Sequence, residues 1–249
     1  MTIPTRPAPL DSAPLDLLSR CIFHARYGDC TLSPLTGQLP TFTRAATASV
    51  VDTLGTAFTV GHSVPAFEPR DWLRAGTRTH HGLLLGASDR LTYPAEFRPR
   101  VTSGWLAFMQ VAAVPAENVA LFSVTTDAAT GARLVLDSSG TAWRLTHHNG
   151  AAGVTATLSN APVAGDSVIL YWTLFDDGSV QLWQIVNFGV ASATARTAAP
   201  TSGTLAASWG TSAKIRLGAS GTGNYGALWV RSAKLVRGVP TYAQLARAF

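Results

Sequence analysis

The stretch Asp166–Val186 constrains the fold more than any other, because its two apolar runs are separated by Asp176-Asp177-Gly178. An Asp-Gly pair between apolar runs is a strong signal for a β-hairpin, since glycine readily adopts the positive φ that the turn needs. In the first run, alternate residues point to opposite sides of a strand, and both sets are largely apolar. We therefore predict a central strand that is covered on both faces.

From Thr41 onward, short apolar segments alternate with turn residues, which is typical of an all-β sandwich rather than of a βαβ fold. A loop is expected near Tyr93-Pro94, and a closing helix over residues 239–249, with Pro240 at its start. The predicted fold is all-β, a two-sheet antiparallel jelly-roll sandwich. Its strands are expected at residues 42–45, 48–52, 57–60, 82–85, 101–114, 118–125, 132–137, 142–147, 154–158, 192–196, 214–218 and 227–236.

Residues 1–40 are rich in proline and predict an extended arm, which leaves residues 41–249 as the sandwich domain. Residues 11–20 are compatible with a short helix inside this arm. An arm of this kind cannot bury its own apolar side chains, so we expect them to dock on the sandwich or on a neighbouring subunit. These assembly residues are Leu10, Leu15, Leu17, Leu18 and Ile22.

Composition excludes several classes of protein. The 249 residues contain no apolar run long enough for a membrane-spanning helix, and the N-terminus lacks the apolar core of a secretory leader. The net charge of +5 comes from scattered arginines, which argues against nucleic-acid binding because that function needs clustered basic residues. Cys21 and Cys30 are either free thiols or a bridge formed after release from the cell.

Three segments in the second half resemble the concanavalin A-like, laminin G-like jelly roll. They are W-T-L-F-D-D-G-S-V-Q-L-W (172–183), K-I-R-L-G-A-S-G (214–221) and N-Y-G-A-L-W-V-R-S-A-K-L (224–235). In that family a strand–turn–strand unit precedes an R-I-G strand, and a glycine-led strand and a short helix complete the domain. The resemblance covers residues 100–249 and implies the same sandwich as the strand pattern.

A second resemblance lies earlier in the chain. Residues 41–56, V-P-A-F-E-P (64–69) and G-L-L-L (82–85) are similar to an opening module of bacteriophage structural proteins. The two resemblances together imply a virion protein of a tailed phage, located in a tail, fibre, tail tip or head decoration.

Catalysis and metal binding receive little support from the sequence. Glycoside hydrolysis needs two carboxylates that flank the scissile bond, and no acidic residues occur at strand spacing for such a pair. Adjacent residues of a strand face opposite sides, so His80-His81 and His147-His148 each offer at most one ligand to a common metal site. Turn formation explains Asp176 and Asp177 without calcium. We expect neither an enzyme nor a cofactor.

The seven tryptophans allow one further reading, because sugar-binding faces use aromatic rings as stacking platforms. Core packing explains Trp105, Trp172 and Trp229. The candidate glycan-binding residues are Trp143, His147, His148, Asn149 and Trp183.

The expected function is therefore a bacteriophage virion structural protein that attaches to other virion subunits through its arm and one surface of the sandwich. We expect it to be made in the host cytoplasm, to reside in the virion and to form a symmetric homo-oligomer. The alternative is a glycan- or receptor-binding module for host adhesion, whose partner is a host-surface glycan.

Overall fold

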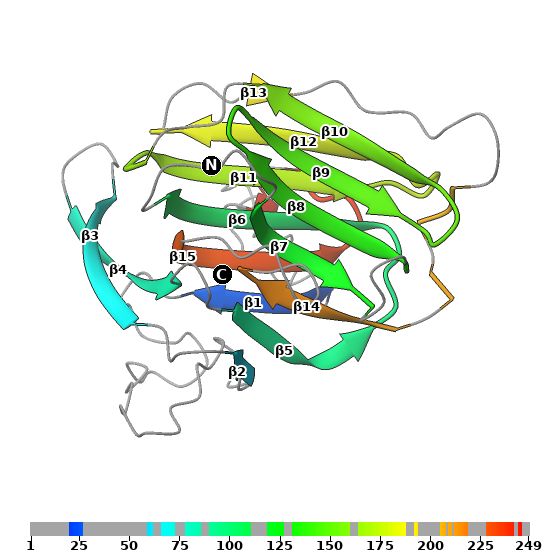
Figure 1. Ribbon diagram of the computed structural model, residues 1–249, viewed down its shortest axis with the longest axis horizontal. Coiled ribbons are helices and arrows are strands. Elements are labelled where there is room, and N and C mark those ends of the chain that lie inside the picture. Colours follow the sequence, from blue (N-terminus) through cyan, green and yellow to red (C-terminus); the bar gives the residue numbers. More distant parts are fainter. Residues whose placement is uncertain are drawn as a thin grey trace, which may run out of the picture.

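The computed structural model describes residues 20–26, 59–61, 66–72, 78–85, 90–110, 119–126, 131–159, 164–187, 192–193, 205–207, 209–210, 212–218, 228–241 and 244–245. These residues form two antiparallel β-sheets that lie face to face (Figure 1). The prediction of an all-β, two-sheet antiparallel sandwich is confirmed, and the arrangement is jelly-roll-like.

The larger sheet has the strand order β13-β12-β11-β6-β15-β4-β3, and β1 also pairs with β15. Its strands are β1 (Cys21–Arg26), β3 (Ala66–Trp72), β4 (Arg78–Leu85), β6 (Thr102–Gln110), β11 (Ser167–Leu174), β12 (Val180–Val186), β13 (Ser192–Ala193) and β15 (Leu228–Arg237). The smaller sheet has the order β10-β9-β8-β7-β14-β5-β2. Its strands are β2 (Thr59–Gly61), β5 (Arg90–Phe97), β7 (Val119–Thr125), β8 (Arg133–Ser139), β9 (Ala142–His148), β10 (Gly153–Ser159) and β14 (Ala213–Leu217).

The predicted central hairpin is β11 and β12. Leu174 pairs with Val180 at its closed end, and Gly178 adopts a φ of 80° in the turn. The Asp177 carboxylate accepts hydrogen bonds from the backbone N–H and the hydroxyl of Ser179, at 2.9 and 2.5 Å. β11 lies between β6 and β12, and all eight of its residues are buried, so the prediction of a strand covered on both faces is confirmed.

The core between the sheets is filled by the inward-facing apolar side chains of both. Trp172 illustrates its tight packing: its ring lies over Gly104, where an added Cβ would be only 2.0 Å from the ring, and its centroid is 5.0 Å from that of Phe122. Burial of this apolar surface is the main source of stability for such a sandwich.

The outer face of the larger sheet carries a row of aromatic residues across neighbouring strands. Trp183, Tyr171 and Trp105 lie side by side in register, and Lys234 follows on β15 with its ammonium 5.4 Å from the Trp105 ring centroid. The Trp183 ring stacks on that of Tyr171 with a centroid distance of 4.8 Å. This row continues the apolar packing beyond the inner core.

The C-terminal segment packs on the same outer face. The Tyr171 hydroxyl donates to the Pro240 carbonyl at 2.5 Å, and the Lys234 ammonium donates to the Leu245 carbonyl at 3.1 Å. Thr241 and Gln244 form a reciprocal capping box, in which each side chain accepts a hydrogen bond from the backbone N–H of the other. This cap begins the first turn of the predicted closing helix, whose remainder lies outside the described residues.

Two segments differ from the sequence predictions. The prediction of a loop near Tyr93-Pro94 is wrong, because both residues lie within β5. Its pairing with β14 shifts between Glu96 and Thr92, so Pro94 occupies a bulge where a missing N–H breaks no regular ladder. The predicted arm is also not wholly outside the sandwich, because residues 21–26 form β1 of the larger sheet.

Of the predicted assembly residues, Ile22 packs against the core of its own chain, and the four leucines lie outside the described residues. Cys30 and the phage-like segment 41–56 also lie outside them. Within the described ranges, no helix has the length and apolar character required to cross a membrane.

Candidate functional site

The five predicted glycan-binding residues occupy three different environments. Trp143 and His147 point into the core and are 0% exposed. Trp183 is half-buried on the outer face of the larger sheet, whereas His148 and Asn149 lie at the end of β9 in the smaller one. The structure therefore brings together only His148 and Asn149, and the prediction that Trp143 and His147 belong to an exposed face is wrong.

Trp143 is a core residue because it faces inward on β9, where its ring meets that of Phe108 edge-on at 5.5 Å and 87°. Sequence alternation placed Trp143 and His147 on the same side of this strand, but it does not show which side is the core. The side of β9 that becomes the core side is set by how the two sheets pack against each other.

His147 joins three parts of the chain inside the sandwich. Its Nδ1 is 2.8 Å from the Gly178 carbonyl in the β11–β12 turn, and its Nε2 accepts a hydrogen bond from the Trp209 indole N–H at 3.0 Å. Since the carbonyl can only accept, Nδ1 carries the proton and the ring is neutral. Burial lowers the pKa of His147 below 6.5, which outweighs the opposite effect of the Gly178 hydrogen bond. This histidine is structural.

His148, the next residue, points outward and has a different role. Its Nδ1 accepts a hydrogen bond from the Gly150 N–H at 3.0 Å, so Nε2 is the protonated nitrogen. The ring lies over Gly153 of β10, where an added Cβ would come within 2.8 Å of it. Burial, with a further contribution from the charge of Arg133, lowers the pKa of His148 below 6.5. His148 is thus a positioned neutral ring that presents an N–H donor.

Asn149 shapes the loop between β9 and β10. Its side-chain oxygen accepts hydrogen bonds from the N–H groups of Ala151 and Ala152, at 2.9 and 3.0 Å. This Asx-turn uses the oxygen that would otherwise meet a ligand. The Asn149 oxygen therefore holds the turn that contains Gly150, whose N–H bonds His148, and a contact of Asn149 with a glycan stays a prediction.

The outward-facing residues of β8, β9 and β10 form a surface that we call the β8–β10 face, and its three central rows are polar except at Val135 and Gly153. Strand register arranges them in three parallel rows. The first row is Arg133, His148 and Gly153, the second is Val135, Thr146 and Thr155, and the third is Asp137, Arg144 and Thr157.

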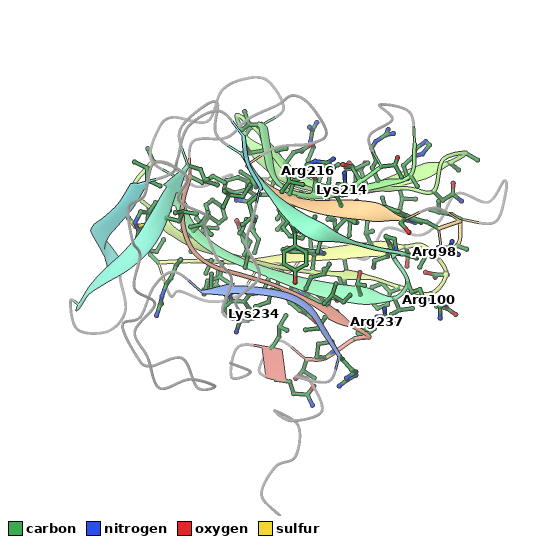
Figure 2. The ribbon with its side chains drawn as sticks, turned by 90° about the horizontal axis from the view of Figure 1, so that it is seen from below. Arg98, Arg100, Lys214, Arg216, Lys234 and Arg237 are labelled. Atoms are coloured by element: carbon green, nitrogen blue, oxygen red, sulfur yellow. The ribbon has the colours of Figure 1, made fainter. Side chains whose placement is uncertain are left out.

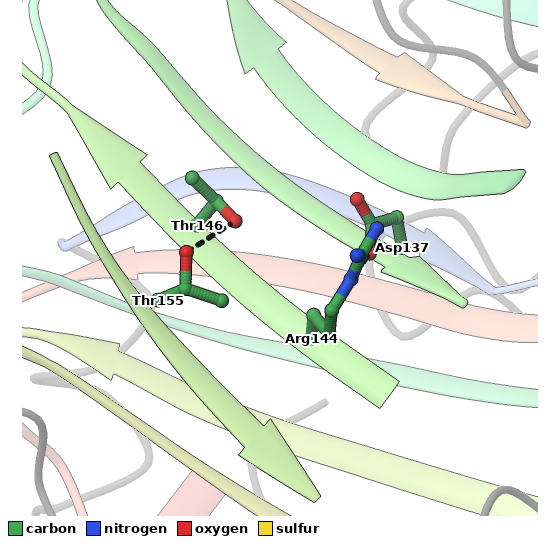
Figure 3. A network of polar contacts seen from close by, with 4 residues as sticks. All are labelled: Asp137, Arg144, Thr146 and Thr155. Carbon is green, nitrogen blue, oxygen red and sulfur yellow. Dashed lines mark hydrogen bonds and ion pairs between the residues drawn. The ribbon is translucent and has the colours of Figure 1, made fainter. Parts of the chain in front are cut away.

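Side-chain contacts within this face hold it in one arrangement (Figure 3). The Arg144 Nε donates to the Asp137 carboxylate at 2.8 Å, and the hydroxyls of Thr146 and Thr155 are hydrogen-bonded at 2.9 Å. Alternate residues of β10 are exposed, which places the hydroxyls of Thr155 and Thr157 at the surface. A surface of this kind offers oriented polar groups without a large rearrangement cost.

The ion pair between Asp137 and Arg144 positions its members more than it stabilises the fold. Burial raises the pKa of the Asp137 carboxyl, and this effect exceeds the opposing effects of the hydrogen bond and charge of Arg144. The two side chains retain exposures of 13% and 25%. The pair therefore fixes the guanidinium with its terminal nitrogens still available to a ligand.

Arg133 is the third charged group of the face. It is half-buried, and its Nη1 donates to the Gly131 carbonyl at 3.3 Å. Arg133, Arg144 and the threonines of β9 and β10 were not among the predicted residues, because the prediction rested on aromatic rings. Strand alternation in R-L-V-L-D, A-W-R-L-T-H-H and G-V-T-A-T-L-S would have placed these polar residues on one side.

Among the residues that the structure describes, no three His, Cys, Asp or Glu side chains are close enough to bind a metal together. β8–β10 contain one acidic residue, Asp137, and it is occupied by Arg144. The face thus offers chiefly hydrogen-bond donors and hydroxyls, which is chemistry suited to binding.

No family model and no curated protein matches the sequence. Solved structures do resemble the fold. A mutant of a GH54 α-L-arabinofuranosidase has a TM-score of 0.60 at 13% identity, over 93% of this chain and 63% of that one. Domain 4 of AbnA, a GH43 extracellular arabinanase from Geobacillus stearothermophilus, in complex with arabinotriose, has a TM-score of 0.54 at 12% identity, over 79% of this chain and 91% of that domain.

The CBM40 of a Ruminococcus gnavus IT-sialidase also matches, at 10% identity over 61% of this chain and 84% of that one, with a lower TM-score of 0.46. The class that the fold defines is a two-sheet β-sandwich, which the AbnA domain and the arabinofuranosidase resemble. At these identities the similarity establishes the fold alone. The chain also spans less than two thirds of the arabinofuranosidase.

Proposed function

We propose that this protein is a non-catalytic carbohydrate-binding module that holds a glycan on the β8–β10 face. The observation that carries the proposal is the set of fixed polar groups on this face, where Arg144, Thr146 and Thr155 are each held by a side-chain hydrogen bond. Carbohydrate hydroxyls both donate and accept, and they bind well to groups that are already oriented, because little conformational entropy is lost.

Two structural neighbours lend support to this proposal. The AbnA domain was solved with arabinotriose, and a second arabinofuranosidase structure, with a TM-score of 0.56, was solved with arabinofuranosyl-α-1,2-xylobiose. Both β-sandwich proteins therefore contact sugars. The virion setting has no such counterpart among these neighbours.

Binding without turnover is the better reading of the chemistry. Glycoside hydrolysis requires an acid and a second carboxylate about 5–10 Å apart. On the β8–β10 face, Asp137 is the single acid of the three strands, and it accepts from Arg144. We therefore propose that the protein binds and releases a glycan without hydrolysing it.

A glycan array probed with the purified chain tests this function. Binding that is lost in Arg144→Gln and retained in Trp183→Phe supports the β8–β10 face, because Trp183 lies on the opposite sheet. The reverse result would move the site to the aromatic row of the larger sheet. A blank array would refute carbohydrate binding.

The virion structural role is the second candidate. It is favoured by the phage-like segments at residues 64–69 and 82–85, whose described parts pair as β3 and β4. The half-buried apolar residues Leu84, Trp183 and Ile185 on the outer face of the larger sheet also suit a contact with another subunit. In that setting the partners are other virion proteins or a second copy of the chain, and a tail-tip adhesion module would combine both functions. Detection of the chain in purified particles tests this proposal.

A further inference from the structure

We infer that the β8–β10 face selects an acidic sugar and holds its carboxylate between Arg133 and His148. This inference rests on the proposed function and specifies its ligand class. It comes from the first row, where Arg133 and His148 occupy paired positions on adjacent strands and carry a positive charge and a hydrogen-bond donor.

Arg133 supplies the charge. Within the part of the chain that the structure describes, its side chain donates one hydrogen bond, to the Gly131 carbonyl, and forms no ion pair. A guanidinium has five N–H donors and no acceptor, so most of its donors are left for a ligand. A half-buried arginine without a carboxylate partner is a favourable position for an anion, because a charge-assisted hydrogen bond is stronger there than in bulk water.

His148 supplies the second donor. It lies opposite Arg133 on the adjacent strand, and neighbouring strands are about 4.8 Å apart. Because its Nδ1 is used by the Gly150 N–H, the free Nε2–H can only donate. An ionised carboxylate can only accept, so it matches both groups, whereas a sugar hydroxyl leaves part of its capacity unused.

The rest of the face fits the remainder of such a sugar chain. Arg144 is four residues from His148 along β9, a distance of about 13 Å. The paired hydroxyls of Thr146 and Thr155 lie between them. A glycan that runs along β9 would place its carboxylate at the first row, its hydroxyls at the second, and another acceptor at the terminal nitrogens of Arg144.

Charges on the neighbouring strands favour the same ligand class. Lys214 and Arg216 of β14 continue the sheet beyond β7, with Lys214 in register with Thr125, which is itself in register with Arg133. Figure 2 shows these two residues on the side of the molecule away from Lys234 and Arg237. Arg216 is buried and donates to Thr125, so it adds no surface charge. Glu96 occupies the register position beside Lys214, and the cationic positions Arg133, Arg144 and Lys214 outnumber the acidic positions Asp137 and Glu96.

Calorimetric titration of the full chain with matched sugar pairs tests the inference. The pairs are trigalacturonate with its neutral methyl ester, and sialyllactose with lactose, so that uronic and sialic carboxylates are distinguished. We expect one acidic sugar to bind at least about tenfold more tightly than its neutral counterpart. Arg133→Gln should weaken that binding by roughly 10- to 100-fold.

The control variant is Arg237→Gln, which changes the net charge equally at an exposed site on the larger sheet, and it should bind as the wild type does. Equal binding of neutral and acidic sugars, unchanged by Arg133→Gln, would overturn the acidic specificity and leave the proposed function intact. Equal weakening by both variants would reduce the effect to net charge and would also overturn the inference. Absence of binding to any sugar would overturn both.

Discussion

Replacing His147 with leucine should destabilise the sandwich strongly. The substitution removes both hydrogen bonds of the imidazole, to the Gly178 carbonyl and from the Trp209 indole. Each partner is then left buried without its bond, at a cost of about 1–3 kcal/mol, so we expect the free energy of unfolding to fall by about 2–6 kcal/mol. Urea denaturation followed by tryptophan fluorescence measures this change.

His148→Leu is the matched control, because it alters the adjacent residue on the opposite face of the same strand. His148 makes one side-chain hydrogen bond at a half-buried position, so its loss should cost less than about 1 kcal/mol. Equal effects of the two substitutions, or a change below about 0.5 kcal/mol for His147→Leu, would refute the structural role of His147.

The same residue predicts the pH dependence of stability. Because burial depresses the pKa of His147 in the folded chain, the unfolded chain binds a proton more readily. The contribution of neutral His147 is fully present above about pH 6.5 and is lost as the pH falls through the lowered pKa, by at most about 1.4 kcal/mol per pH unit. His147→Leu should flatten the stability profile in this range, and an unchanged slope would contradict the argument.

The remaining predictions concern packing and recognition. Gly104→Ala should lower the free energy of unfolding by about 1–3 kcal/mol, because the added Cβ would overlap the buried ring of Trp172. A Cβ at Gly210 would meet nothing within 4 Å, so Gly210→Ala should leave the free energy of unfolding nearly unchanged. Urea denaturation measures both changes. Binding of an acidic sugar should tighten as the pH falls through the lowered pKa of His148, because the protonated ring adds a positive charge next to that of Arg133. The residue on the other side of the ring, Gly153 of β10, carries no charge that would oppose this effect. Calorimetry at several pH values measures this change, and affinity that weakens or stays constant over that range would count against a contact with His148.

The regular strands were predictable because their signals are local. The Asp-Gly turn and the flanking apolar runs defined β11 and β12, and turn residues delimited β7 to β10. Pro94 predicted a loop because a proline inside a strand is tolerated only at an edge or bulge, and the bulge depends on the partner strand β14. The capping box of Thr241 and Gln244 was readable from the sequence as a Thr-x-x-Gln pattern.

The site was less predictable than the fold. Alternation shows which residues share a face, so His147 and His148 were correctly separated, but it does not show which face meets the other sheet. Trp143 was therefore assigned to the surface although it fills the core. The pairing of Arg133 with His148 depends on the register of β8 against β9, which follows from the turn at Gly140 and could not be read from composition.

The central claim is that a sugar binds on the β8–β10 face. An NMR titration of the backbone amides with an acidic oligosaccharide tests it most directly. The account predicts that the shifted resonances cluster at Arg133, Thr146, His148 and Thr155, while those of Trp183 on the other sheet stay in place. Shifts confined to the larger sheet, or a spectrum that does not respond to the sugar, would contradict it.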